Sequence, residues 1–252
     1  MSGAEHYDRV TEAWQHYVMG PDLHFGFFEG TEPLKEATRR LTDRQLQKLD
    51  LQPNLRVLDV GCGIGTTTAR MAADFGADAV GLSNSPRGIE LASKAHENAR
   101  FVCADAADNG LANASFDRVL LLESMHMMPD KTQVLQECLR VLKPGGLLVA
   151  CDVCSVSDFG DHMVYYVGLG HSTRVAAGFR DAMNTLMKSV FGLEQLEHLR
   201  TYRDAATQAG FTDVEVDNIS APTRATLDRW ADNTLTHEAK LKEVRPDYPQ
   251  NM

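Results

Sequence analysis

The chain has 252 residues, of which 43% are hydrophobic and 24% are charged, so it is long enough for one domain with a sizeable core and some additions. Its formal net charge of −10 and its isoelectric point near 5.3 argue against a nucleic acid as substrate or partner, because phosphate binding requires a basic face. No apolar signal core follows Met1 and no run of about eighteen apolar residues occurs, so we expect no stable membrane insertion and a cytoplasmic protein.

The first 50 residues are expected to form a helical segment ahead of the core. Residues 31–49 have the apolar spacing of an amphipathic helix, with Pro33 near its start and Leu34, Ala37 and Leu41 on one face. An aromatic-rich stretch, residues 20–28, precedes this helix.

A strand that runs into a glycine-rich turn is the most informative feature of the chain. Residues 57–60 are an apolar run interrupted by Asp59, and Gly61, Gly63 and Gly65 follow at a spacing of two. Such glycines let the backbone approach a ligand, and the helix expected over residues 66–75 presents unpaired N–H groups at its start. The pattern therefore predicts a nucleotide-binding turn.

Strands and helices then alternate. Strands are predicted over residues 79–82, 101–106 and 115–123, and a helix over residues 131–142 is followed by a Pro-Gly-Gly turn and a fifth strand from Leu147. This alternation predicts an α/β fold with a parallel, doubly wound sheet.

The pattern changes after the fifth strand. Apolar residues at helical spacing predict a helical cap within residues 155–192. Residues 194–209 predict another helix closed by Gly210, Val214 to Val216 are expected to begin the last strands, and residues 244–252 form a loose tail. We thus expect four parts: an N-terminal helical lid segment (1–50), a cofactor-binding core (51–154), a cap (155–192), and the C-terminal part of the core with the tail (193–252).

Residues 57–65 resemble motif I of the class I S-adenosylmethionine-dependent methyltransferases, and the elements that follow continue the match over residues 50–155. The resemblance implies a Rossmann-like sheet, an enzyme and S-adenosyl-L-methionine as cofactor. The alternatives are an NAD-dependent oxidoreductase and a non-catalytic binding module on the same fold. Thr66 stands where a dinucleotide fingerprint has its third glycine, and Ser83 where the ribose-binding acid is expected, so both disfavour the oxidoreductase.

The resemblance also implies a set of cofactor-binding residues. Asp59, Gly61 and Gly63 would lie under the methionine part, where a carboxylate suits an ammonium group. A hydroxyl and an amide, Ser83 and Asn84, replace the usual carboxylate at the ribose diol and can still hydrogen-bond to it. Asp105 matches the acid that meets the adenine amino group, although an ordinary turn aspartate is the alternative. Ala106 and Leu122 complete the expected set.

Residues 81–85, Gly-Leu-Ser-Asn-Ser, resemble a small-molecule subgroup that includes tocopherol, cyclopropane-fatty-acid-like and natural-product sugar methyltransferases. Residues 20–28 resemble the N-terminal lid of that subgroup, which would close over the pocket. We expect His24, Phe25 and Phe27 to form an apolar substrate mouth. The alternative is a surface loop that places its phenylalanines in the core.

Residues 123–130 resemble the Glu-Ser-x-His-His-Met-Pro-Asp segment of the same subgroup, with Met127 in place of the second histidine. The resemblance implies that His126 is a general base, since imidazole changes charge near neutral pH, and that Asp152 orients it. A buried histidine satisfied by a backbone carbonyl beside a structural aspartate is the alternative.

The expected acceptor is a hydrophobic small molecule, because Met125, Met127 and Tyr165 would add apolar walls to the pocket. A hydroxyl of a secondary metabolite would use the base His126. An alkene, prenyl or aromatic carbon would instead need aromatic faces and a carboxylate such as Glu123.

The five cysteines are expected to be reduced thiols. Cys151 and Cys154 form a CxxC pair at a strand end, where no helix dipole activates a thiol. No second pair or spaced histidine pair accompanies them, so we predict no metal site.

Overall fold

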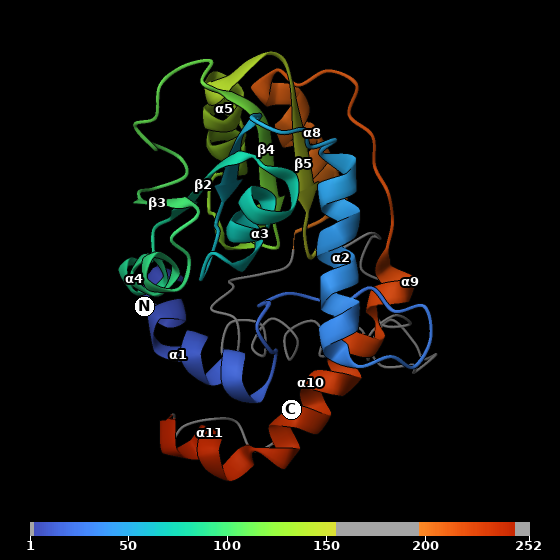
Figure 1. Cartoon of the computed structure of the whole chain (residues 1–252). Helices are drawn as coiled ribbons and strands as arrows, with labels where there is room; N and C mark the ends of the chain where they lie inside the picture. The colour runs from blue at the N-terminus through green and yellow to red at the C-terminus, as the bar shows by residue number, and fades with distance from the viewer. Residues whose placement is uncertain (1–2, 155–196, 245–252) are drawn as a thin grey trace.

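The computed structural model describes residues 3–154 and 197–244 (Figure 1). The predicted cap over residues 155–192, with Tyr165, and the predicted tail beyond residue 244 lie outside the described residues. The helices and strands, in chain order, are α1 (Gly3–Tyr17), α2 (Leu34–Lys48), β1 (Arg56–Val60), α3 (Thr66–Phe75), β2 (Asp78–Ser83), α4 (Pro86–Ala95), β3 (Arg100–Cys103), β4 (Phe116–Leu122), the 3-10 helix η1 (Met125–Met127), α5 (Lys131–Val141), β5 (Leu142–Cys151), α8 (Leu199–Ala209), α9 (Ser220–Thr223), α10 (Ala225–Thr236) and α11 (Glu238–Val244).

The five strands form one parallel sheet in the order β3-β2-β1-β4-β5. The chain runs outward from β1 to β3 and then returns to the other side of β1 with β4, which confirms the predicted doubly wound sheet. The direction of winding reverses between β1 and β4, and ligands in such sheets bind at the carboxyl ends of the strands near this switch point. Asp59 of β1 lies in this region, paired in register with Gly81 of β2 and Leu120 of β4.

Helices cover both faces of the sheet because alternate strand residues point to opposite sides. Val57 and Leu120 belong to a buried cluster with Leu46 of α2 and Met71 of α3. On the opposite face, Leu58 belongs to a second cluster with residues of α5 and α8. The inner strands β1 and β2 are buried on both faces, as expected for a parallel sheet.

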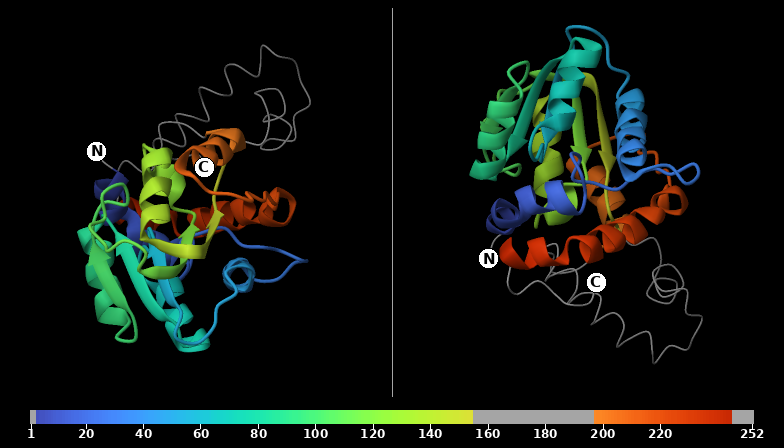
Figure 2. Two further views of the ribbon diagram at one scale, coloured as in Figure 1. Left: turned by 90° about the horizontal axis from the view of Figure 1, so that it is seen from above. Right: turned by 60° about the horizontal axis from the view of Figure 1, so that its bottom comes forward.

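A third layer, made by α1, α10 and α11, lies across the carboxyl ends of the strands (Figures 1 and 2). Trp14 of α1, Trp230 of α10 and Leu241 of α11 form its buried centre. This layer joins the two ends of the described chain. Within residues 3–154 and 197–244, no helix has the length and apolarity needed to cross a membrane.

Local patterns located most core elements. The predicted helix over residues 66–75 has the same bounds in the structure, and the helix predicted over residues 31–49 is α2. Strand β3 is shorter than predicted, because the chain turns at Asp105, whose Oδ1 accepts a hydrogen bond from the Ala107 N–H at 2.8 Å. Strand β5 begins earlier than predicted, at Leu142, and its irregular register places the Pro-Gly-Gly segment in a bulge.

The strand predicted at Val214 to Val216 is wrong. These residues have no regular secondary structure and pair with no strand in the described chain, and both valines are exposed. Asp217 instead forms ion pairs with Arg44 and Lys48 of α2, at 2.5 and 3.4 Å, so the segment passes over α2 rather than joining the sheet. The chain then forms α9, α10 and α11, which the sequence analysis did not predict.

Candidate functional site

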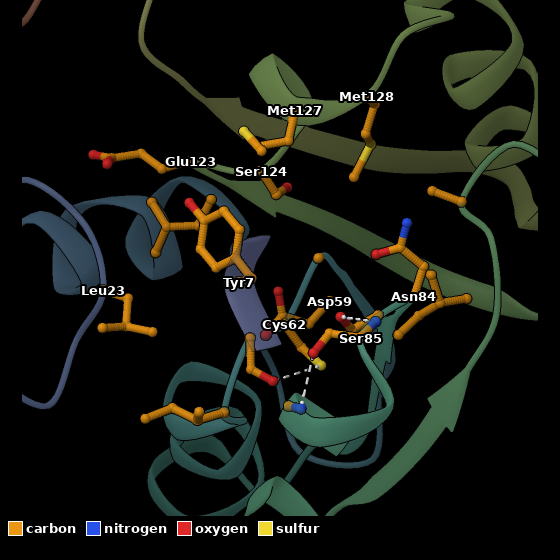
Figure 3. Close-up of a pocket in the computed structure, with 18 of the residues that line it drawn as sticks. Tyr7, Leu23, Asp59, Cys62, Asn84, Ser85, Glu123, Ser124, Met127 and Met128 are labelled. Carbon is orange, nitrogen blue, oxygen red and sulfur yellow. Dashed lines mark hydrogen bonds between the residues drawn. The ribbon is translucent and has the colours of Figure 1, made fainter. Parts of the chain in front are cut away.

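A cavity of about 510 Å³ lies at the carboxyl ends of β1, β2 and β4 (Figure 3). This volume is in the range of small-molecule sites. Helix α1, the segment after it, the glycine turn, and the loops after β2, β3 and β4 form its walls. Its lining comprises Tyr7, Thr11, Pro21–His24, Asp59, Gly61–Ile64, Thr66, Thr67, Leu82–Ser85, Gly88, Asp105–Ala107, Leu122–Ser124, Met127–Asp130 and Val134.

All eight residues that we predicted as cofactor-binding line this cavity: Asp59, Gly61, Gly63, Ser83, Asn84, Asp105, Ala106 and Leu122. They come from four separate loops or strand ends of the sheet. The fold therefore brings together, in one cavity, residues that lie in separate segments of the sequence.

The three glycines of the turn all have left-handed backbones, but the surroundings of a side chain added at each would differ. A Cβ added to Gly61 would lie 2.3 Å from the Ser124 Cβ, and one on Gly65 would lie 2.6 Å from the Phe101 ring. A Cβ on Gly63, where φ is 54°, would have no protein atom within 4 Å. Packing within the protein thus explains Gly61 and Gly65, whereas Gly63 leaves cavity space open for a ligand.

Asp59 is a buried carboxylate at the cavity wall. It is 2% exposed, and its Oδ2 accepts a hydrogen bond from the Thr68 hydroxyl at 2.6 Å. Burial raises the pKa of Asp59 to about 6, and the Thr68 bond opposes this rise. The carboxylate is therefore ionised at neutral pH and would be stabilised by a cationic ligand group.

The loop after β2 presents neutral hydrogen-bonding groups. The Ser83 hydroxyl oxygen accepts from the Ser85 N–H at 3.2 Å, and the Ser85 hydroxyl oxygen caps α4 by accepting from the Gly88 N–H at 2.9 Å. The Ser85 hydroxyl also donates to Asp8, which ties α1 to this loop. Asn84 is exposed and its side chain lines the cavity (Figure 3).

Asp105 is a turn residue that also lines the cavity. Its Oδ1 accepts from the Ala107 N–H, while its Oδ2 accepts no hydrogen bond within the described ranges. One carboxylate oxygen thus shapes the turn and the other is available to a ligand. The two roles that we weighed against each other are compatible.

His126 and Asp152 form the predicted pair. His126 Nδ1 lies 2.5 Å from Asp152 Oδ1, and the His126 backbone N–H donates to Asp152 Oδ2 at 2.9 Å. The Val153 N–H also donates to Asp152 Oδ1, at 2.7 Å. The two side chains are only 9% and 5% exposed, and a carboxylate at Nδ1 favours the tautomer that leaves Nε2 as the acceptor.

The pair does not itself line the cavity that the described residues form. The neighbours of His126 in η1 and before it, Ser124 and Met127, do line it. The imidazole is therefore placed beside this wall rather than in its surface.

Glu123 directly follows β4, has a left-handed backbone with φ 47°, and lines the cavity. Both of its carboxylate oxygens lie 3.0 Å from the Phe25 nitrogen, which donates to them. Burial raises the pKa of Glu123 well above its ordinary value, the Phe25 N–H opposes this, and the charge of Asp152 adds to it.

Phe25 and Phe27, which we predicted as part of an aromatic substrate mouth, do not line the cavity that the described residues form. The Phe25 ring packs against the Trp230 ring with centroids 4.6 Å apart, and Phe27 lies under the Arg44 guanidinium, 5.2 Å from its carbon. The first contact is made to α10 and the second to α2, and neither contact could be predicted from the sequence around residues 25–27. The alternative, a segment that packs its phenylalanines on the protein, describes them better.

Of the other predicted substrate residues, His24 and Met127 line the cavity and Met125 does not. His24 borders the cavity but is 5% exposed, with Nδ1 donating to the Phe25 carbonyl oxygen at 2.7 Å and Nε2 accepting from the Thr42 hydroxyl at 3.0 Å. Burial lowers the pKa of His24, so it is a neutral structural residue. Met127 lines the cavity, whereas Met125 is buried in the cluster with α5 and α8. Tyr165 lies outside the described residues.

Tyr7 and Thr11 of α1 line the cavity and were not predicted. Figure 3 shows the Tyr7 ring between Glu123 and the glycine turn. Burial first, and then the charges of Glu123 and Asp152, raise the pKa of Tyr7, so its hydroxyl stays protonated. No local sequence pattern predicts that these residues line a cavity, because α1 is placed there by its packing against α10 and α11, which lie near the other end of the chain.

The CxxC cysteines are unreactive in this setting. Burial raises the pKa of Cys151 well above its ordinary value and that of Cys154 to about 11, so both thiols are protonated at neutral pH. Among the residues that the structure describes, no group of histidine, cysteine and acidic side chains could hold a metal ion.

The chain matches a protein family described as "Methyltransferase domain" over residues 58–150. The matched range contains the whole sheet except Arg56 and Val57 of β1 and Cys151 of β5. The matched range includes every predicted cofactor-binding residue.

Three curated relatives are similar to the chain. Methyltransferase GfsG of Streptomyces halstedii is 32% identical over 231 residues, which are 88% of this chain and 77% of that protein. The 27-O-demethylrifamycin SV methyltransferase of Amycolatopsis mediterranei is 41% identical over 152 residues, 58% of this chain and 54% of that protein. Sterol 4-C-methyltransferase strm-1 of Caenorhabditis elegans is 31% identical over 175 residues, 66% of this chain and 52% of that protein.

Among solved structures, the cyclopropane synthase MmaA2 from Mycobacterium tuberculosis superposes with a TM-score of 0.80 at 22% sequence identity. The alignment covers 96% of this chain and 86% of that one. At this identity the likeness describes the fold alone.

Proposed function

The chain belongs to the class I S-adenosylmethionine-dependent methyltransferases, and we propose that it methylates a hydroxyl group of a hydrophobic small molecule. The observation that carries the choice of a hydroxyl is the His126–Asp152 pair, with 2.5 Å between Nδ1 and Oδ1. The similarity to the rifamycin SV methyltransferase and to the sterol 4-C-methyltransferase supports a small-molecule acceptor.

The cavity fits the cofactor in the chemistry of its walls. Asp59 offers a buried carboxylate for the ammonium group, and Gly63 leaves space where any side chain would intrude. Asn84 and Ser83 offer hydrogen bonds to the ribose diol, and Asp105 Oδ2 offers one to the adenine amino group. When bound, S-adenosylmethionine supplies a methyl group that is already activated on a sulfonium.

The protein's own contribution is to position the acceptor, exclude water and remove a proton. Met127 and Met128 give the cavity apolar surface on one side and Leu23 gives it apolar surface on another (Figure 3). His126 Nε2 takes the proton of the acceptor hydroxyl. Asp152 holds the Nδ1 proton and stabilises the imidazolium that results.

A carbon acceptor is the second candidate, and the placement of Glu123 favours it. Glu123 lines the cavity, whereas His126 does not, and a carboxylate beside the acceptor would stabilise a developing positive charge. The experiment that separates the two candidates determines whether the transferred methyl group is on oxygen or carbon in the product. A methyl ether supports the hydroxyl reaction, and a new carbon–carbon bond supports the alternative.

Cofactor affinity is expected to depend on pH through Asp59. A bound ammonium group lowers the pKa of Asp59 from its value of about 6, so below that pH binding must first release a proton. Affinity for S-adenosylhomocysteine should be constant between about pH 7 and 8 and fall by up to about tenfold per pH unit below about 6. Calorimetric titration across this range measures it. Asp59→Asn should bind more weakly at pH 7 and lose this dependence; an equal fall in the variant would contradict the assignment.

Two substitutions of Asp105 are expected to distinguish its role in the turn from its role in cofactor binding. Asp105→Asn can keep the bond to the Ala107 N–H but loses the carboxylate that faces the cavity, so affinity for S-adenosylhomocysteine should fall by about 5- to 30-fold, ~1 to 2 kcal/mol, with an unchanged melting temperature of the free protein. Asp105→Ala should lower both. The matched control, Asp108→Asn, makes the same charge change at an exposed position outside the cavity lining. Unchanged affinity in Asp105→Asn would leave only the turn role.

A further inference from the structure

Residues 21–24 form part of the cavity wall, and the next residue, Phe25, is attached to the sheet by a single side chain. The Phe25 N–H donates to the carboxylate of Glu123, with both oxygens at 3.0 Å, across 98 positions of sequence. This contact joins the N-terminal segment directly to the end of β4, one residue from Leu122 and Ser124, which also line the cavity.

The following three residues are attached to helices. The Gly26 N–H donates to the Thr226 hydroxyl oxygen of α10 at 2.9 Å. The N–H groups of Phe27 and Phe28 donate to the carbonyl oxygens of Ala37 and Pro222, each at 2.8 Å. Within residues 3–154 and 197–244, Glu123 therefore provides the hydrogen bond that holds residues 25–28 to the sheet itself.

Glu123 makes this contact from an energetically costly position. A non-glycine residue at φ 47° is strained by about 1 kcal/mol, and a buried carboxylate needs hydrogen bonds to offset its desolvation. The left-handed turn follows directly after β4 and is fixed by the Glu123 N–H, which donates to the Cys151 carbonyl oxygen at 2.7 Å. Figure 3 shows the side chain at the edge of the cavity near Tyr7, on the side of Leu23.

We propose that Glu123 is a positioning residue: its carboxylate holds residues 21–25 closed over the cavity and thereby slows cofactor release. This inference rests on the proposed placement of the cofactor in the cavity, and it is independent of the acceptor. It assigns to Glu123 a role through its reach to the Phe25 N–H rather than through its charge.

Two conservative variants separate reach from charge. Glu123→Gln keeps the length of the side chain and an acceptor oxygen, whereas Glu123→Asp keeps the charge but is one methylene too short, and aspartate tolerates the left-handed backbone. Affinity for S-adenosylhomocysteine, measured by calorimetry, should fall about tenfold or more in Glu123→Asp and Glu123→Ala, and Glu123→Gln should restore it to within about threefold of the wild type. Glu97→Ala, at an exposed position, controls for the loss of one negative charge.

Hydrogen exchange of the cofactor-free protein gives a second readout that needs neither turnover nor ligand. The Phe25 amide should exchange about tenfold faster or more in Glu123→Asp than in the wild type, and near the wild-type rate in Glu123→Gln. Wild-type affinity and exchange in Glu123→Asp would overturn the proposal, as would a Glu123→Gln protein as defective as Glu123→Asp. Failure of the hydroxyl reaction would leave both measurements unchanged, so the two claims fail separately.

Discussion

Replacing His126 by alanine is expected to lower turnover by about two to four powers of ten while cofactor affinity stays within about twofold of the wild type. The imidazole makes no contact that shapes the cofactor end of the cavity, and its side chain does not line the cavity. Its loss should therefore remove proton transfer without removing binding. Steady-state kinetics on a hydroxyl acceptor, with calorimetry of the cofactor-free variant, measures both quantities.

The partner residue sharpens this test. Asp152→Asn should cause a smaller loss, since one acceptor oxygen remains for the three N–H groups that Asp152 now serves. The double variant should be little worse than His126→Ala alone, because residues that act as a unit fail together.

The control for these losses is His16→Ala, which removes an exposed imidazole from α1 and should leave turnover unchanged. Near-normal turnover in His126→Ala would exclude it as the base. The carbon-acceptor reaction, with Glu123 among the residues that line the cavity, would then be the better account.

Replacing Gly63 by valine is expected to weaken S-adenosylhomocysteine binding by about a hundredfold, ~2.7 kcal/mol. A Cβ added at Gly63 has no protein atom within 4 Å, so the valine side chain would occupy cavity space that the ligand needs. Gly145→Val is the matched control. Gly145 also has a left-handed backbone, φ 77°, and no protein atom within 4 Å of an added Cβ, but it lies in the bulge of β5 away from the cavity.

Both glycine variants should therefore lose stability from backbone strain, and only Gly63→Val should lose affinity. Thermal melting and calorimetry of the two proteins give the comparison. Gly61→Val is a poorer test, because its Cβ would collide with Ser124 and disturb the fold itself. A folded Gly63→Val protein with wild-type affinity would show that the cofactor does not lie against this turn.

The sheet and the cofactor loops could be predicted because their signals are local. The apolar run through Val60, the glycines after it and the helix start at Thr66 are contiguous, and the structure keeps the predicted helix bounds of α3. Each of the loops after β2, β3 and β4 can likewise be predicted from a short motif at the end of its strand. In a parallel sheet these strand ends lie at the same edge, so the topology alone places the three loops side by side.

The rest of the site depends on contacts between distant parts of the chain. Tyr7 reaches the cavity because Trp14 packs with Trp230 and Leu241 in one cluster, and no window of sequence contains that contact. The same layer takes up the Phe25 ring, which is why an aromatic segment that looked suited to substrate faces α10 instead.

The strand predicted at Val214 to Val216 fails for a related reason. Alternating side chains favour a strand, but a strand also needs a partner edge, and residues 214–216 pair with no strand in the described chain. The ion pairs of Asp217 with Arg44 and Lys48 hold the segment against α2, so it does not pair with β5.

The most direct test of the central claim is mass spectrometry of a library of hydrophobic hydroxyl compounds incubated with the protein and S-adenosylmethionine labelled in its methyl group. We predict a product that gains one labelled methyl group, with fragmentation placing the label on oxygen. Label on carbon, or no labelled product although calorimetry shows that the cofactor binds, would contradict the proposed reaction.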